Sequence, residues 1–230
     1  MGHAERVNGV LGDLLPLALG VAISPVPIIA TILMLLAPQA RGTSIDFLVG
    51  WVAGIVVATT IFTVIASTAG LDDGSDDSST TSAWIKLVLG VLLLLVAVRQ
   101  WGRRPKPGEE AALPKWMAAI DSFTFVKALG LGFLLSAVNP KNLLMCVAAG
   151  TAIGGADLST GEAVVSVAVF TVIAASTVAL PVLGFLVAHE RLRHPLDELR
   201  TWLQANNVAV MSVLVLVIGV VLLGQGIGGL

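Results

Sequence analysis

A lysine stands in the middle of a long apolar segment, at Lys141, directly after a proline that interrupts the segment. A charged amine at membrane depth is costly unless it is paired, hydrated or neutral, so its presence there indicates function. Its chemistry would be to bind an anionic group or to cycle a proton. Asn139 and Asn142 flank it with amide groups that would orient such a group, while Pro140 opens the helix. The alternative, that Lys141 snorkels to the surface of a shorter span, stays open.

The first half of the chain carries a similar interruption, at Ser24, Pro25 and Pro27. Each proline removes a backbone donor, which leaves the carbonyls one turn earlier, near Val21 and Ile23, without helical partners. The Ser24 hydroxyl can bond those carbonyls or a substrate. A membrane helix tolerates such a break where the freed backbone lines a polar cavity, and a simple kink is the alternative. One break in each half of the chain predicts a small secondary transporter.

The composition is that of a membrane protein. Of the 230 residues, 56% are hydrophobic and 12% are charged, whereas soluble domains carry about 25% charged residues. The mean hydropathy is +0.94. The net charge is −2 and no basic face stands apart from the membrane loops, so we expect no nucleic acid as a partner.

Motifs of soluble enzymes are missing from the sequence. There is no GxSxG nucleophile elbow and no phosphate-binding GxxxxGK(S/T) loop, and the single cysteine, Cys146, excludes a CxxC pair. His189 and His194 have the wrong spacing for an HExxH zinc motif. We therefore expect no enzymatic activity, no cofactor and no metal.

Apolar runs that reach the roughly 20 residues needed to cross a bilayer recur along the chain. We predict six spans, at residues 13–37, 45–70, 83–100, 124–152, 163–188 and 205–228. The expected fold class is an all-α polytopic membrane protein of six transmembrane helices, of which the first and fourth are broken by proline. Asp13, Asp46 and Asp121 fall at or beyond span entrances, so no carboxylate is expected at mid-membrane depth.

A weak internal repeat relates the two halves. The tripeptide Ala-Leu-Gly at residues 18–20 recurs at residues 128–130, and Pro27 aligns with Pro140 at nearly the same spacing. Three spans in each copy force the second copy to insert upside down, which gives an inverted repeat. We expect a first repeat at 1–104, a cytoplasmic linker at 105–123 and a second, inverted repeat at 124–230.

Charge in the connecting loops predicts the orientation. Basic residues lie at Arg41, within 99–115 and within 191–200, whereas the alternate loops carry acids at 72–77 and at Asp157. By the positive-inside rule the basic loops face the cytoplasm and both termini lie outside.

Two further patterns concern packing and polar lining. Gly50 and Gly54 form a GxxxG motif, and Gly224 and Gly228 form another. Such motifs allow close helix contact within a chain or between copies, so a homo-oligomer is one expected assembly. In span five, Ser176 and Thr177 precede Pro181 and can supply polar lining.

With these features the chain resembles the LysE superfamily of bacterial exporters, and within it the GAP branch of glycolipid- and sulfolipid-addressing proteins. The resemblance covers essentially the whole chain. Its specific part is Asn139-Pro140-Lys141, whereas the Pro-x-Pro region has Val26 where the family has glycine. The resemblance implies export from the cytoplasmic side, of amino acids in one branch and of large glycolipids in the GAP branch.

The expected function is secondary export across the bacterial cytoplasmic (inner) membrane, with the site where spans one and four cross. The substrate would be an anionic lipid or glycolipid precursor, with an amino acid or small metabolite as the second choice. Membrane lipids are the expected surroundings. The alternative is a non-transporting scaffold subunit that recruits a lipid-export machinery through the basic loop at 99–115.

Overall fold

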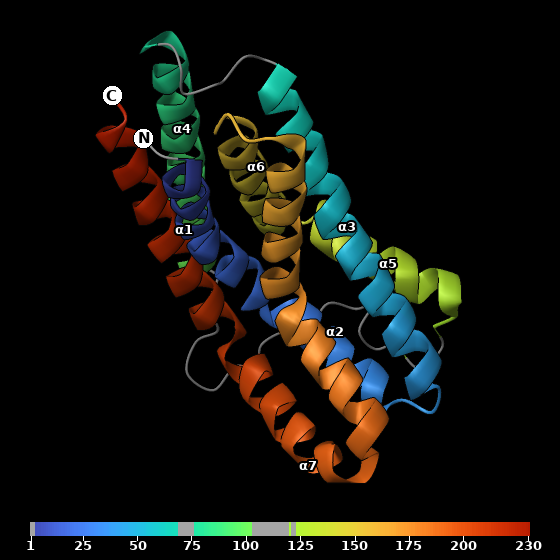
Figure 1. The fold of residues 1–230 in the computed structure, drawn as a ribbon. Helices are drawn as coiled ribbons and strands as arrows, with labels where there is room; N and C mark the ends of the chain where they lie inside the picture. The colour runs from blue at the N-terminus through green and yellow to red at the C-terminus, as the bar shows by residue number, and fades with distance from the viewer. Residues whose placement is uncertain (1–2, 69–75, 103–119, 121–122) are drawn as a thin grey trace.

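The computed structural model describes residues 3–68, 76–102, 120 and 123–230, and every regular element in these ranges is a helix. The helices are α1 (His3–Ala22), α2 (Pro25–Leu36), α3 (Ala40–Thr68), α4 (Asp76–Trp101), α5 (Phe125–Ala137), α6 (Pro140–Gly154) and α7 (Thr160–Gly228). The longest, α7, contains a kink at Ala188, whose backbone angles (φ −131°, ψ 45°) are not helical. It therefore consists of two helices, Thr160–Ala188 and Arg191–Gly228, which meet at a turn and diverge from it in Figure 1.

The helices include four that are long and apolar enough to cross a membrane. Two bent pairs, Val7–Ala22 with Pro25–Leu36 and Phe125–Ala137 with Pro140–Gly154, raise the number to six if each pair is one span. These pairs bend by 51° and 61° at the two predicted proline breaks. The all-helical, multi-pass class is thereby confirmed.

Helix boundaries differ from the predicted spans where the helices continue into polar sequence. The last helix begins at Arg191 and not at residue 205, so the predicted loop at 191–200 is wrong. Pairs one turn apart support this polar extension, with Arg200 and Asp197 at 3.2 Å. Likewise α4 begins at Asp76, before the predicted span. The predicted linker at 105–123 and acidic loop at 72–77 lie largely outside the described residues.

Glycines bring α3 into backbone contact with both halves of the second bent pair. A Cβ atom on Gly50 would lie 2.0 Å from the Leu129 carbonyl oxygen of α5, and one on Gly154 of α6 would lie 2.3 Å from Thr63 O. The first GxxxG motif is therefore used within the chain. Gly224 and Gly228, in contrast, have no heavy atom within 4 Å of a Cβ position.

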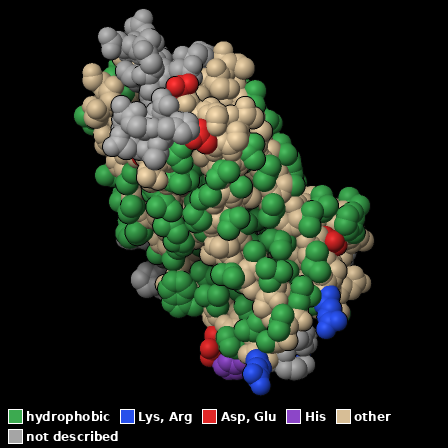
Figure 2. Space-filling view, in the orientation of Figure 1, with side chains coloured by type: hydrophobic (Ala, Val, Ile, Leu, Met, Phe, Trp, Pro, Cys, Tyr) green, Lys and Arg blue, Asp and Glu red, His purple; other side chains and the backbone are tan. Residues whose placement is uncertain are grey.

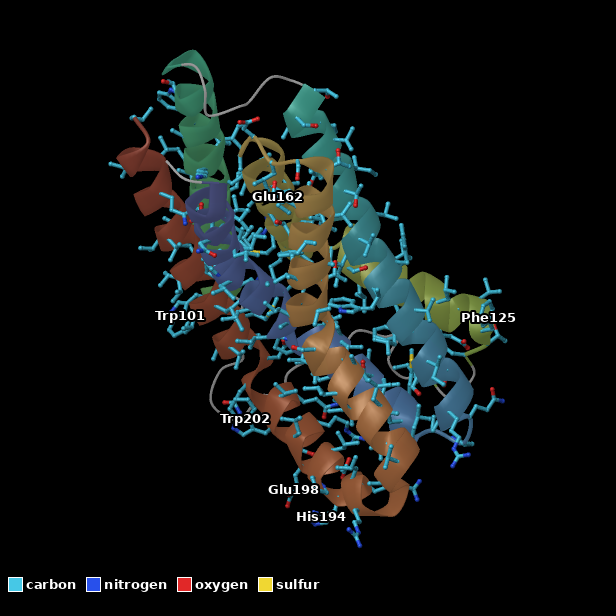
Figure 3. The ribbon with its side chains drawn as sticks, in the orientation of Figure 1. Trp101, Phe125, Glu162, His194, Glu198 and Trp202 are labelled. Atoms are coloured by element: carbon cyan, nitrogen blue, oxygen red, sulfur yellow. The ribbon has the colours of Figure 1, made fainter. Side chains whose placement is uncertain are left out.

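Basic side chains gather at one end of the molecule. Both chain termini lie at the same end in Figure 1, and α7 turns at the opposite end. Figure 2 shows apolar side chains over the visible flank, with Lys and Arg side chains gathered near that turn. There, Arg41 and Arg193 line one cavity of about 680 Å³. Two of the predicted basic segments therefore meet at one end of the molecule. In Figure 3 the labelled His194 and Glu198 mark the turn.

Candidate functional site

The first break results from a serine and a proline that together end one helix and start the next. α1 ends at Ala22, and Ser24 adopts an extended conformation (φ −87°, ψ 108°) as the residue before α2. Proline disfavours the helical conformation in the residue before it, and its own fixed φ suits the first position of a helix. Pro25 occupies that position. The chain therefore bends between α1 and α2 inside one apolar segment.

Side chains from distant parts of the sequence bond the freed carbonyls of α1. The Lys141 ammonium nitrogen donates a hydrogen bond to the Gly20 carbonyl oxygen. The Thr177 hydroxyl donates one to the Ala22 carbonyl oxygen. Both acceptors lie in the last turn of α1, whose carbonyls have no helical donors because the helix ends there. The first break is thus closed by one side chain from α6 and one from α7.

The second break is closed by its own residues. Asn139 precedes α6, and its side-chain oxygen accepts a hydrogen bond from the Lys141 backbone N–H at 3.1 Å. The Asn142 side-chain amide donates to the Leu135 carbonyl oxygen of α5 at 2.9 Å. Pro140 takes the first helical position. Asn142 therefore donates to a carbonyl locally, as Lys141 and Thr177 do at the first break, while Asn139 accepts from the first turn of α6.

Lys141 is a buried amine held against a helix end. Its side chain is 2% exposed, so it does not snorkel to the surface. Its ammonium nitrogen is bonded to Gly20 O, at the C-terminal end of α1, where the helix dipole carries partial negative charge. Among the described residues, no carboxylate forms an ion pair with it. The Lys141 amine is therefore bonded by a backbone carbonyl and not by a carboxylate.

Two predicted site residues retain unused hydrogen-bonding capacity. Ser24 is 1% exposed and its hydroxyl has no hydrogen-bond partner among the described residues. Asn142 is fully buried, and its side-chain oxygen likewise has no partner in the described part of the chain. Buried polar atoms are nearly always bonded, so such atoms on both sides of a crossing point indicate a place where a ligand or water can bind.

The three prolines differ in their surroundings. Pro25 and Pro27 are buried in the core at the first break, and the Pro27 carbonyl accepts a hydrogen bond from the Thr31 hydroxyl at 2.8 Å. Pro140 is exposed on the outer side of the second break. Ser24, Lys141 and Asn142 are therefore all buried, whereas Pro140 is exposed.

Two contacts of α1 were missed by sequence reasoning. Gly20 supplies the carbonyl for Lys141, although the Ala-Leu-Gly repeat had marked its neighbourhood. Asp13, predicted at a span entrance, lies inside the apolar helix Val7–Ala22. Its carboxylate accepts a hydrogen bond from the Gln225 amide at 2.8 Å and lies 3.8 Å from the Lys86 ammonium. These contacts join α1 to α4 and α7, and no sequence motif announces them.

The described part of the candidate site contains no cluster of His, Cys, Asp or Glu side chains. Within the described ranges, no group of three or more His, Cys, Asp or Glu side chains could hold a metal ion. Cys146 of α6 is buried and free. The chemistry available at the crossing is therefore that of one ammonium, amides, a hydroxyl and backbone carbonyls, which bind and orient a ligand.

An all-helical chain with two proline-broken apolar helices and a buried lysine between them is a polytopic membrane protein of the broken-helix type. Comparison with protein families agrees and is more specific. The chain belongs to the SfLAP family, described as Sap, sulfolipid-1-addressing protein, whose model matches residues 14–228. The Sap/GAP-type resemblance is thereby confirmed, while membership of the wider LysE superfamily stays a prediction. No curated protein and no solved structure matched the chain.

Proposed function

We propose that this protein is a secondary exporter that moves an anionic lipid or glycolipid precursor out of the cytoplasmic side of the bacterial inner membrane. The observation that carries the proposal is the buried Lys141 ammonium at the point where the two broken helices cross. A lysine in that position is costly, and an anionic headgroup is the ligand that compensates the cost best. The family description, which names a sulfolipid, supports a substrate of that charge.

Substrate binding would exchange the partner of Lys141. A phosphate, sulfate or carboxylate oxygen is charged, so it forms a stronger hydrogen bond to an ammonium than a neutral carbonyl does. An arriving headgroup would therefore displace Gly20 O, and the Ser24 hydroxyl and Asn142 side-chain oxygen would bond its polar groups. Loss of the Lys141 bond would release the end of α1. Binding and movement of the first half-helix would thus be linked.

The packing of the helices supports two inverted repeats. α3, from the first half, packs on the broken pair of the second half through Gly50 and Gly154. The helix Thr160–Ala188, from the second half, bonds the broken pair of the first half through Thr177. α4 packs against the end of α7, where Gly90 and Gly219 approach each other. This exchange of partners is what a two-fold relation between repeats produces, and such repeats are a common basis for alternating access.

A scaffold subunit of a lipid-export machinery is the second candidate function. One observation favours it, because the Lys141 ammonium already has a backbone partner and could serve only to fasten α6 to α1. In that case the basic segment at 99–115 would bind other proteins. If Lys141 is purely structural, its substitution would lower the amount of folded protein and thereby also lower export. The two functions are therefore separated only by comparing variants at equal membrane abundance.

The proposal is tested by lipid profiling of cells. Cell-surface lipids and medium metabolites are compared in a deletion strain restored with the wild type, Lys141→Met or Lys127→Met, at equal membrane abundance. Lys127 is the matched control because it lies on the same broken pair but is exposed. We expect one lipid to be lost with Lys141→Met and retained with Lys127→Met. Full rescue by Lys141→Met, with failure of Arg103→Glu/Arg104→Glu, would contradict the exporter and support the scaffold.

The proposed orientation places both termini outside. It is supported by Arg41 and Arg193, which line a cavity at the end of the molecule opposite to the termini. Arginines near span ends favour the cytoplasmic side.

A further inference from the structure

An apolar groove lies between α1 and the last helix, at the level of the first break. Its volume is about 590 Å³, within the range of about 300–1,000 Å³ of small-molecule sites. One wall is formed by Pro16, Leu19 and Gly20, which share a face of α1 by their spacing, and by Ile23 just after the end of α1. The facing wall carries mostly small side chains, of which Ala209, Val213 and Val217 recur every fourth residue. These short side chains hollow the flank of the molecule.

Gly20 links this groove to the candidate site. It lines the groove, and its carbonyl oxygen accepts the hydrogen bond from the Lys141 ammonium. A Cβ atom at this position would lie 2.3 Å from Ile218 Cδ1 and 3.2 Å from Met145 Sδ. The last helix, α1 and α6 therefore meet at Gly20. Gly20 therefore borders both the apolar groove and the buried Lys141 amine.

The apolar lining of the groove and its place in the membrane indicate what kind of molecule it binds. Its lining residues carry no polar side chain, and it opens from helices that are apolar enough to cross a membrane. At that depth the surrounding medium is the hydrocarbon of lipids. An apolar channel beside an ammonium complements a molecule with a hydrocarbon chain and an anionic head.

We propose that this groove binds one acyl chain of the exported lipid while the headgroup is at Lys141, so that the substrate enters sideways from the bilayer. The inference rests on the proposed function and adds to it a path and a binding site for the tail. The wall residues Leu19 and Val213 are 49% and 55% exposed, as a surface for a hydrocarbon chain requires. A second copy of this chain is the competing occupant, and the test separates the two.

The test is photo-crosslinking with a phosphatidylglycerol that carries a diazirine in its acyl chain. The purified chain is placed in phosphatidylcholine nanodiscs with a trace of this probe, and crosslinked residues are mapped by mass spectrometry. The variants are Val213→Trp, Leu19→Trp and the control Val64→Trp, which lies on α3 and is 52% exposed. We expect crosslinks to concentrate on the two groove walls. They should fall about tenfold in both groove variants, which corresponds to about 1.4 kcal/mol of lost binding, and stay unchanged in Val64→Trp.

Each outcome decides the proposal. Crosslinks spread evenly around the molecule, or crosslinks that survive both groove substitutions, would overturn it, as would crosslinks between two copies of the chain through the groove. Export is then measured with the groove variants at equal membrane abundance. Lost crosslinking with normal export would overturn the lateral path, while the exporter itself would stand on the Lys141 result. Loss of both supports the proposal.

Discussion

The two breaks are built from similar residues but are held in opposite ways. The second break closes itself, because Asn139 and Asn142 bond backbone groups of their own segment. The first break is closed from outside, because Lys141 and Thr177 reach its carbonyls from later helices. Sequence similarity between the halves therefore conceals a difference in stability. A break that closes itself is a fixed part, whereas one that depends on two distant side chains can be released.

The surrounding helices reinforce this difference. The second break is clamped by backbone contact, since Gly132 of α5 and Gly50 of α3 each leave no room for a Cβ atom. At the first break the described polar contacts of α1 with Lys141 and Thr177 are two side-chain hydrogen bonds. A hydrogen bond between neutral groups contributes about 1 kcal/mol net, and one to a charged group about 1.5–3 kcal/mol, so either can be exchanged for a bond to a ligand. The first half-helix is thus the expected moving part.

The largest effect is expected from Gly50→Val, which disrupts the backbone contact between α3 and α5 that holds the second break. The new side chain would meet the Leu129 backbone, where even a Cβ atom lies at 2.0 Å. Overpacking of this kind costs about 1–3 kcal/mol or more, because backbone must shift. We expect a lower unfolding temperature in detergent and a lower abundance in the membrane. Gly130→Val is the control, since no heavy atom lies within 4 Å of its Cβ position. Equal losses in both variants would show that the clamp is not at Gly50.

The external closure of the first break is weakened by Thr177→Val, which removes the hydroxyl and keeps the shape. The Ala22 carbonyl then loses its donor, at an expected cost of about 1 kcal/mol. Hydrogen exchange should rise at residues 21–24 and stay unchanged at residues 137–142. Ser176→Ala is the control, because that hydroxyl bonds Ile173 within its own helix. Faster exchange at both breaks would contradict their independence.

The smallest effect on stability is expected from Ser24→Ala. The hydroxyl has no partner among the described residues, so its removal leaves no bond unmade. The unfolding temperature should therefore be unchanged or slightly raised, because a buried unpaired hydroxyl is unfavourable. Export, measured by the same lipid profiling, should nevertheless fall. Ser136→Ala is the stability control, since Ser136 bonds the Gly132 carbonyl at 3.0 Å. A clear loss of stability in Ser24→Ala would show a structural role.

Much of the fold could be predicted because it follows from local sequence. Apolar runs of sufficient length determine spans, and proline determines where two of them break, so both bends occur where expected. The polar ends of helices could not be predicted by the same signal. The apolar run of the last predicted span begins at residue 205. The helix itself begins earlier, at Arg191, because charged pairs one turn apart support it.

The site could be predicted in part. Lys141 and Asn142 were recognisable because polar groups inside an apolar run need partners, and both are buried. The identity of those partners depends on tertiary structure. Gly20 lies 121 positions before Lys141 and offers only a backbone carbonyl. The Ala-Leu-Gly repeat marks its neighbourhood but does not indicate that it bonds Lys141. Asp13 was predicted at a span entrance. Its contact with Gln225 could not be predicted, because the two residues lie at opposite ends of the chain.

Export of lipid by the isolated chain tests the central claim most directly. The surface lipid that the deletion strain lacks is isotopically labelled and placed in the inner leaflet of liposomes that contain only the purified protein. Its appearance in the outer leaflet is followed for the wild type, Lys141→Met and Lys127→Met at equal incorporation. We predict movement with the wild type and Lys127→Met, and none above protein-free liposomes with Lys141→Met. Equal movement with Lys141→Met, or none with the wild type, would contradict export through a site at Lys141.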